Sequence, residues 1–88
     1  MLTVYSKNYC PFCDKAKHLL KTKNVAYTEI NIDEDQESRE WLVAQGHRTA
    51  PQIYQGSELF VEGGYQGLAR LSDEELFNKL GDSSVSDK

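Results

Sequence analysis

The sequence predicts one α/β domain, built in the order strand, helix, strand, helix, two strands, helix. Three observations lead to this prediction. A chain of 88 residues has room for a single hydrophobic core. Runs rich in β-branched and aromatic residues alternate with segments whose apolar residues recur at helical spacing. The first predicted strand and helix also flank a Cys-x-x-Cys motif, which is typical of a redox site in such a context.

The first half of the chain predicts a strand, a helix and a second strand. The run "LTVY", Leu2 to Tyr5, has the composition of a short buried strand. From Pro11 apolar residues recur on one helical face as far as Lys23-Asn24, where lysines suit the negative end of a helix. The run "VAYTEINID", Val25 to Asp33, alternates as a strand does. Its alternating positions are Ala26, Thr28, Ile30 and Ile32. A strand–helix–strand unit favours a parallel pair with a right-handed crossover.

The second half predicts a helix, a hairpin and further helical structure. The helix covers residues 33–46, with Trp41, Leu42 and Ala44 inside and Gly46 at its end. The hairpin covers residues 51–64, with its turn at 55–57. In residues 65–81, Ser72 and the glutamate three positions later form a capping-box pattern. We place the domain in residues 1–80 and expect residues 81–88, which are small and polar, to form a flexible tail.

Charge and hydropathy exclude several classes of function. The formal net charge is −4, and the carboxylates are dispersed among lysines and arginines, which argues against binding to nucleic acid or a membrane surface. The segment after Met1 lacks the pattern of a secretion signal, and no apolar run approaches the ~20 residues of a membrane span. We therefore expect a soluble, cytoplasmic protein.

The two cysteines, Cys10 and Cys13, lie where a helix is predicted to begin. Pro11 suits the first helical position, so Cys10 would be the N-cap residue, where free backbone N–H groups and the helix dipole favour a thiolate. Lys7 and Lys15 would add to this effect. A thiolate is the nucleophile of disulfide exchange, and Cys13, one turn further on, would resolve a mixed disulfide formed on Cys10.

The cysteine pair has three other interpretations. Structural zinc normally has four ligands, but only His18 and His47 are available besides the cysteines, without a finger-like spacing. Attached c-type haem would require histidine directly after the second cysteine, where Asp14 stands. Two ordinary cysteines in a helical turn are the remaining alternative. The strand–helix–strand context favours redox chemistry over all three.

Three segments resemble the glutaredoxin family when taken together and in order. They are "YCPFC" at Tyr9–Cys13, "RTAPQI" at Arg48–Ile53 and "GG" at Gly63-Gly64. The resemblance extends from Met1 to about Leu80. It implies a thioredoxin-like fold, with a four-stranded mixed sheet covered by helices on both faces, and a monomeric protein.

The resemblance also implies a set of glutathione-binding residues. Pro51 would be a cis proline facing the cysteines, so that the backbone of Ala50 meets the incoming disulfide. Thr49 and Arg48 would flank the site, with Arg48 and Lys7 available to a glutathione carboxylate. The remaining implied residues are Tyr9 and Phe12 as apolar walls beside the sulfur, and Gly63 and Gly64 as a close backbone approach to the γ-glutamyl end.

Simpler alternatives stay open at four of these positions. Pro51 could simply open a strand, the glycine pair could be an ordinary turn, Lys7 could be a solvated loop lysine, and Tyr9 could cover the core. One departure from the family pattern follows the glycine pair. An acidic or hydroxyl residue and then Asp are usual there, whereas this chain has Tyr65, Gln66 and Gly67. Gln66 can accept a hydrogen bond but carries no charge.

The resemblance implies a glutathione-dependent thiol–disulfide oxidoreductase that acts through Cys10 and Cys13 and requires no metal. Its partners would be glutathione and proteins that carry disulfides or bound glutathione, with ribonucleotide reductase among the candidates. Two alternatives come with the family. One is a thioredoxin-like redoxin reduced by a flavoprotein reductase, which the departure at Gln66-Gly67 keeps open. The other is an iron–sulfur cluster carrier ligated by glutathione, against which Pro11 argues because it stiffens the loop.

Overall fold

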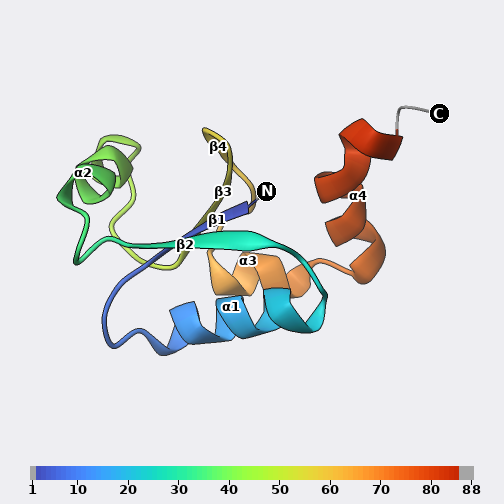
Figure 1. Ribbon diagram of the computed structural model, residues 1–88, viewed down its shortest axis with the longest axis horizontal. Helices are drawn as coiled ribbons and strands as arrows, with labels where there is room; N and C mark the ends of the chain where they lie inside the picture. Colours follow the sequence, from blue (N-terminus) through green and yellow to red (C-terminus); the bar gives the residue numbers. More distant parts are fainter. Residues whose placement is uncertain (1, 86–88) are drawn as a thin grey trace.

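The computed structural model describes the backbone of residues 2–85 and the side chains of residues 2–80. The elements follow the predicted order, with the last helical segment divided in two (Figure 1). They are β1 (Leu2–Ser6), α1 (Pro11–Thr22), β2 (Tyr27–Asn31), α2 (Gln36–Ala44), β3 (Gln52–Gln55), β4 (Glu58–Leu59), α3 (Tyr65–Arg70) and α4 (Asp73–Val85).

The four strands form one mixed sheet in the order β2-β1-β3-β4. Strand β1 pairs in parallel with β2, so that Leu2 lies opposite Tyr27, as the predicted crossover requires. On its other side β1 pairs antiparallel with β3, and Val4 lies opposite Ile53. Strands β3 and β4 form the predicted hairpin. The central position of β1 and β3 places the loop after β1 and the loop before β3 at the same end of the sheet.

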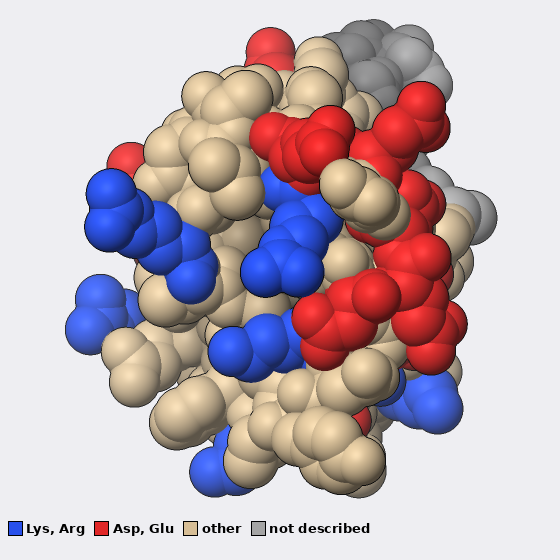
Figure 2. Space-filling view, turned by 90° about the vertical axis from the view of Figure 1, so that its left-hand side faces the viewer, with Lys and Arg blue, Asp and Glu red and all other residues tan. Residues whose placement is uncertain are grey.

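Helices cover both faces of this sheet, as expected. Helices α1 and α3 pack against each other on one face, and α2 lies on the other (Figure 1). On the α2 face, the Trp41 ring contacts Tyr5 and Tyr54, with ring centroids 5.9 and 5.0 Å apart respectively. The side of the molecule that carries α2 is strongly charged, with Lys and Arg side chains across its centre and an arc of Asp and Glu beside them (Figure 2).

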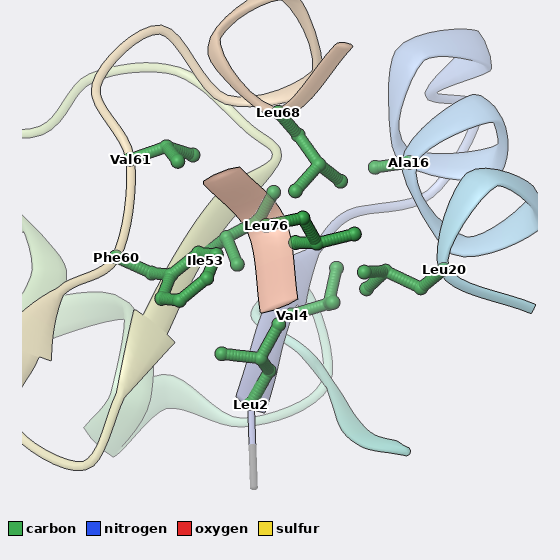
Figure 3. Close-up of a cluster of buried hydrophobic side chains, with 9 residues drawn as sticks. All are labelled: Leu2, Val4, Ala16, Leu20, Ile53, Phe60, Val61, Leu68 and Leu76. Atoms are coloured by element: carbon green, nitrogen blue, oxygen red, sulfur yellow. The ribbon is translucent and has the colours of Figure 1, made fainter. Parts of the chain in front are cut away.

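The main core lies between the sheet and helices α1, α3 and α4 (Figure 3). Alternation along β1 buries Leu2 and Val4 there, and α4 contributes Leu76. Each such side chain stabilises the fold by about 1.5–3 kcal/mol when it leaves water. The members of the cluster are Leu2, Val4, Ala16, Leu20, Ile53, Phe60, Val61, Leu68 and Leu76. This core fixes α1 against the sheet, and with it the start of the helix that carries the cysteines.

Local details of three elements differ from the sequence prediction. On β2, Tyr27 packs against the main core, whereas Thr28 of the predicted alternating series is exposed, because β2 is an edge strand with one weakly covered face. Ala44, expected inside α2, is exposed because this short helix buries only Leu42. Helix α4 continues to Val85, five residues beyond the predicted boundary at Leu80. Residues 86–88 of the predicted tail lie outside the described residues.

The capping box divides the C-terminal helical segment. The backbone N–H of Ser72 donates to the Glu75 carboxylate at 3.0 Å, and the N–H of Glu75 donates to the Ser72 hydroxyl at 3.1 Å. Leu71, just before it, is extended and ends α3. The predicted Ser72 cap is therefore confirmed. Within the described range, no helix has the length and apolar character to cross a membrane.

Candidate redox site

Cys10 is the N-cap residue of α1, as the sequence predicts. Its backbone is extended, Pro11 occupies the first helical position, and the N–H of Cys13 points at the Cys10 sulfur from 3.2 Å. In reduced protein the same N–H and the positive end of α1 would stabilise negative charge on this sulfur. The local sequence thus places one cysteine where a thiolate is favoured.

The two cysteines form a disulfide in this structure, with their Cα atoms 5.2 Å apart. Their surroundings differ. Cys13 faces the core and is only 1% exposed, while Cys10 is 8% exposed at the edge of the surface. An external disulfide can therefore reach Cys10 far more readily than Cys13, which matches the roles of attacking and resolving cysteine.

The loop before β3 forms a wall beside Cys10. The Ala50–Pro51 peptide bond is cis, as expected, and the Ala50 carbonyl oxygen lies 3.6 Å from the Cys10 sulfur. Buried Gln52 holds this loop, because its side-chain amide donates to the carbonyl and hydroxyl of Thr49 at 2.9 and 3.3 Å. The interpretation of Pro51 as an ordinary strand-opening proline is thus wrong.

A cavity of about 440 Å³ lies beside this wall and brings together most of the predicted glutathione-binding residues. Those among its lining residues are Phe12, Thr49, Ala50, Pro51, Gly63, Tyr65 and Gln66. Phe12 and Tyr65 stack with their ring centroids 6.1 Å apart, and the Lys15 ammonium lies over both rings. The result is a pocket with polar and apolar lining, and it includes Ala50, whose carbonyl oxygen contacts the Cys10 sulfur.

Gly64 contacts the wall directly. It has a positive φ of 58°, and a Cβ built on it would lie 2.4 Å from the Pro51 carbonyl oxygen. A side chain is therefore excluded, so the glycine pair is more than an ordinary turn. Gly67, on α3, is equally constrained: its Cβ would lie 1.8 Å from the carbonyl oxygen of Glu62. Position 67 thus has no room for a side chain.

Besides Gly64, three predicted residues do not line this cavity. Lys7 and Arg48 line a neighbouring cavity of about 180 Å³, which shares Thr49 with the first one. Tyr9 is fully exposed, with a positive φ of 56°, so the alternative that it covers the core is wrong. Lys7 and Arg48 therefore lie on the opposite side of Thr49 from the glycine pair.

Four further residues line the main cavity without having been predicted from the sequence. They are His47, Gln52, Leu59 and Glu62. Glu62 supplies a carboxylate beside Gly63, and it directly precedes the glycine pair, which was the available signal. His47 lies 2.6 Å from the Tyr54 hydroxyl through its Nε2 atom. Burial, and secondarily the neighbouring Tyr5, raises the pKa of Tyr54 above its ordinary value of 10.0.

An ion-pair network supports the end of β1 just before the active-site loop. The buried Ser6 hydroxyl and the Lys17 ammonium both donate to the Glu29 carboxylate at 2.8 Å. The hydrogen bond from Lys17, followed by that from Ser6, lowers the pKa of Glu29 below 4.5, and the same bond raises the pKa of Lys17 above 10.5. This network ties α1 to β1 and β2. Among the described residues no group of three or more His, Cys, Asp or Glu gathers as a metal site.

Comparisons with known proteins agree with this geometry. The family model described as Glutaredoxin matches residues 2–60. The glutaredoxin-like protein NrdH of Lactococcus lactis subsp. cremoris is 40% identical over 72 residues, which are 82% of this chain and 100% of the relative. The solved NrdH-redoxin of Escherichia coli, described by its thioredoxin-like activity profile, is 32% identical with a TM-score of 0.61, covering 64% of this chain and 74% of that one.

A buckwheat glutaredoxin solved in complex with glutathione is also similar. It is 27% identical with a TM-score of 0.73, over 92% of this chain and 76% of that one. The relatives are thus divided between glutaredoxins and NrdH-type redoxins, and both share the thioredoxin-like fold that the sequence predicts. Because the family model matches more than half of the chain, and because the dithiol lies at the start of α1 beside a cis proline, this chain belongs to the glutaredoxin family.

Proposed function

We propose that this chain is a cytoplasmic, glutathione-dependent oxidoreductase that reduces protein disulfides and protein–glutathione mixed disulfides. The observation that carries the proposal is the arrangement of charge around Cys10. Glu62 lies beside the glycine pair in the main cavity, and Lys7 and Arg48 line the cavity on the other side of Thr49. Glutathione has an ammonium and a carboxylate at its γ-glutamyl end and a second carboxylate at its glycine end, so Glu62 can pair with the ammonium while Lys7 and Arg48 pair with the glycine carboxylate.

The reaction needs only thiol chemistry. The Cys10 thiolate attacks the glutathione sulfur of a mixed disulfide, a new S–S bond forms, and the protein thiolate leaves with the electron pair and takes up a proton. A second glutathione thiolate then attacks the glutathione sulfur held on Cys10. Glutathione disulfide leaves, and Cys10 returns as a thiolate.

Protein disulfides follow a second route, in which Cys13 takes part. Attack by Cys10 gives a mixed disulfide with the substrate protein, and Cys13 then attacks the Cys10 sulfur and releases the reduced substrate. The resulting Cys10–Cys13 disulfide is reduced by two molecules of glutathione. Ribonucleotide reductase is one candidate substrate, as the family resemblance implies.

The test is NADPH-coupled turnover of a small glutathione mixed disulfide in the presence of glutathione and glutathione reductase. Wild type and Cys13→Ser should both turn over, because glutathione alone can resolve its adduct on Cys10, and Cys10→Ser should be inactive. Full activity of Cys10→Ser would show that the roles are assigned wrongly. Folded wild type that gives no turnover would refute dependence on glutathione.

A redoxin reduced by a flavoprotein reductase is the second candidate. It is favoured by α3, which has no acidic residue in its first turn and no room for one at Gly67. The similarity to NrdH-type redoxins supports it as well. Replacing glutathione and its reductase by thioredoxin reductase in the same assay, with a protein disulfide as substrate, separates the two donors.

A further inference from the structure

A groove leads away from the main cavity between α2 and the segment that follows β2. Its first part, of about 180 Å³, shares His47 and Thr49 with the main cavity. Its second part, of about 390 Å³, continues from the first over Ile32, Arg39 and Val43. We call this surface the basic groove. It is defined by Lys7, Ile32, Arg39, Val43 and Arg48.

Three cations without an ion-pair partner in the described part of the chain gather along the basic groove. The side chains of Lys7, Arg39 and Arg48 form no ion pair or hydrogen bond with any described residue, whereas Lys17 and Lys23 are paired with carboxylates. Figure 2 shows Lys and Arg side chains gathered on this side of the molecule. Such a surface attracts acidic groups.

The carboxylates of the groove accept hydrogen bonds from other groups of the chain. Asp33 accepts a hydrogen bond from the backbone N–H of Asn8 at 2.8 Å, and Glu40 accepts one from the Gln36 side chain at 3.0 Å. Asp33 lines both parts of the groove and Glu40 lines the second, but neither forms an ion pair with the three cations. A bound acidic side chain would therefore lie beside the cations and away from Asp33 and Glu40, which would repel it.

The groove also offers apolar surface. Val43 is 61% exposed although it lies on a helix, and Ile32 beside it is half-buried. Both line the second part of the groove. An apolar side chain of a bound segment would cover this surface, at a gain of about 25 cal/mol for each Å² removed from water. The chemistry of the groove thus fits an extended peptide that combines acidic and apolar residues.

We propose that the basic groove binds the segment of a substrate protein that adjoins its reactive cysteine, and that it selects acidic segments with an apolar residue. This rests on the part of the proposed function in which Cys10 attacks protein disulfides, and it is independent of the electron donor. Because the basic groove is continuous with the main cavity, one extended segment can place its sulfur at Cys10 and its neighbouring side chains on Arg39 and Val43.

The test uses the Cys13→Ser variant and two peptides that carry their cysteine as a mixed disulfide with thionitrobenzoate. One peptide has Glu and Val on both sides of the cysteine, and the other has Gln in place of each Glu. The Cys10 thiolate attacks the peptide sulfur, the peptide–Cys10 disulfide forms, and the coloured thionitrobenzoate anion leaves with the electron pair. The second-order rate constant is followed by absorbance at low and high salt.

The Glu peptide should react several-fold faster than the Gln peptide at low salt, and the advantage should shrink as salt screens the charges. Adding Arg39→Gln should lower the rate for the Glu peptide about 3-fold to 5-fold and leave the Gln peptide unchanged. The matched control is Arg70→Gln, which removes the same charge from an exposed position on α3, outside the groove. It should leave the ratio of the two rates as it is.

Three results would overturn the proposal. Equal rates for both peptides, with rapid release of thionitrobenzoate, would refute the docking site while leaving Cys10 as the nucleophile. Equal effects of Arg39→Gln and Arg70→Gln would show that only net charge matters. A dimer by sedimentation that Arg39→Gln dissociates would assign the groove to a second copy of the chain. Absence of release from either peptide would instead refute the assignment of Cys10.

Discussion

Replacing Gly67 by alanine should destabilise the protein, even though alanine is the better helix former. The residue lies in α3, and its φ is not in the left-handed region. A Cβ at this position would lie 1.8 Å from the carbonyl oxygen of Glu62 and 2.9 Å from the carbonyl carbon. Both atoms belong to the backbone, so a side-chain rotation cannot relieve the contact. Either α3 or the preceding loop must move.

The expected magnitude follows from two opposing contributions. Overpacking against a rigid neighbour costs about 3 kcal/mol at the upper end of the usual range. Alanine recovers about 1 kcal/mol of helix propensity relative to glycine. The net loss in the free energy of unfolding is therefore about 2 kcal/mol, which lowers the Tm of a domain of this size by roughly 8–15 °C.

Urea denaturation followed by circular dichroism measures this loss. The control is Ala69→Gly, at an exposed position of the same helix, which should lose only the propensity difference of about 1 kcal/mol. If Gly67→Ala is instead more stable than wild type, the contact with Glu62 is not restrictive and the reasoning fails. The same contact predicts that Gly67→Asp also destabilises the fold.

Three further predictions concern other parts of the molecule. Glu29→Gln should lower the free energy of unfolding by about 0.5–1 kcal/mol, because it loses the ion pair with Lys17. Since the folded-state pKa of Glu29 is lowered, this difference should be complete above pH 4.5 and disappear as the pH falls through the folded-state value, as measured by urea denaturation at several pH values. Glu62→Gln should raise the KM for glutathione about 3-fold to 5-fold with little change in kcat, while Glu58→Gln, outside the main cavity, should not; equal effects would contradict a role in binding. Tyr54→Phe removes a hydrogen bond to a histidine and should cost about 1 kcal/mol in thermal unfolding, whereas an unchanged Tm would show that the bond contributes nothing.

Much of the fold could be predicted because local signals determine it. Pro11 at the first helical position fixes where α1 begins, and this alone makes Cys10 the N-cap residue. The capping box at Ser72 and Glu75 fixes the start of α4 in the same way. Such signals act within one turn of helix, so they can be read without knowledge of the tertiary structure.

The composition of the candidate site was less predictable because it depends on contacts between distant segments. Glu62 enters the main cavity only because the hairpin brings it beside the loop that contains Pro51. Arg39 lies on α2, whereas Lys7 follows β1 and Arg48 precedes β3. The three residues line one cavity only because these separate segments pack together. Periodicity predicts that Ala44 is buried, yet it is exposed because the short α2 buries only Leu42. Pattern indicates which residues can be buried, but only the packed structure decides which neighbours they meet.

The distribution of charge around Cys10 also predicts how a glutathione molecule is oriented. Its ammonium would be directed toward Glu62 and the glycine pair, and its glycine carboxylate toward Lys7 and Arg48, with the sulfur between them at Cys10. In the reverse orientation the ammonium would meet the two cations, and the glycine carboxylate would meet Glu62. Repulsion between Glu62 and the glycine carboxylate would then raise the free energy of the complex above that of the favoured orientation. Reversing one charge, in Glu62→Lys, should therefore raise the KM for glutathione in the coupled assay more than Glu62→Gln does, because the glutamine only removes the attraction; equal KM values would contradict this orientation.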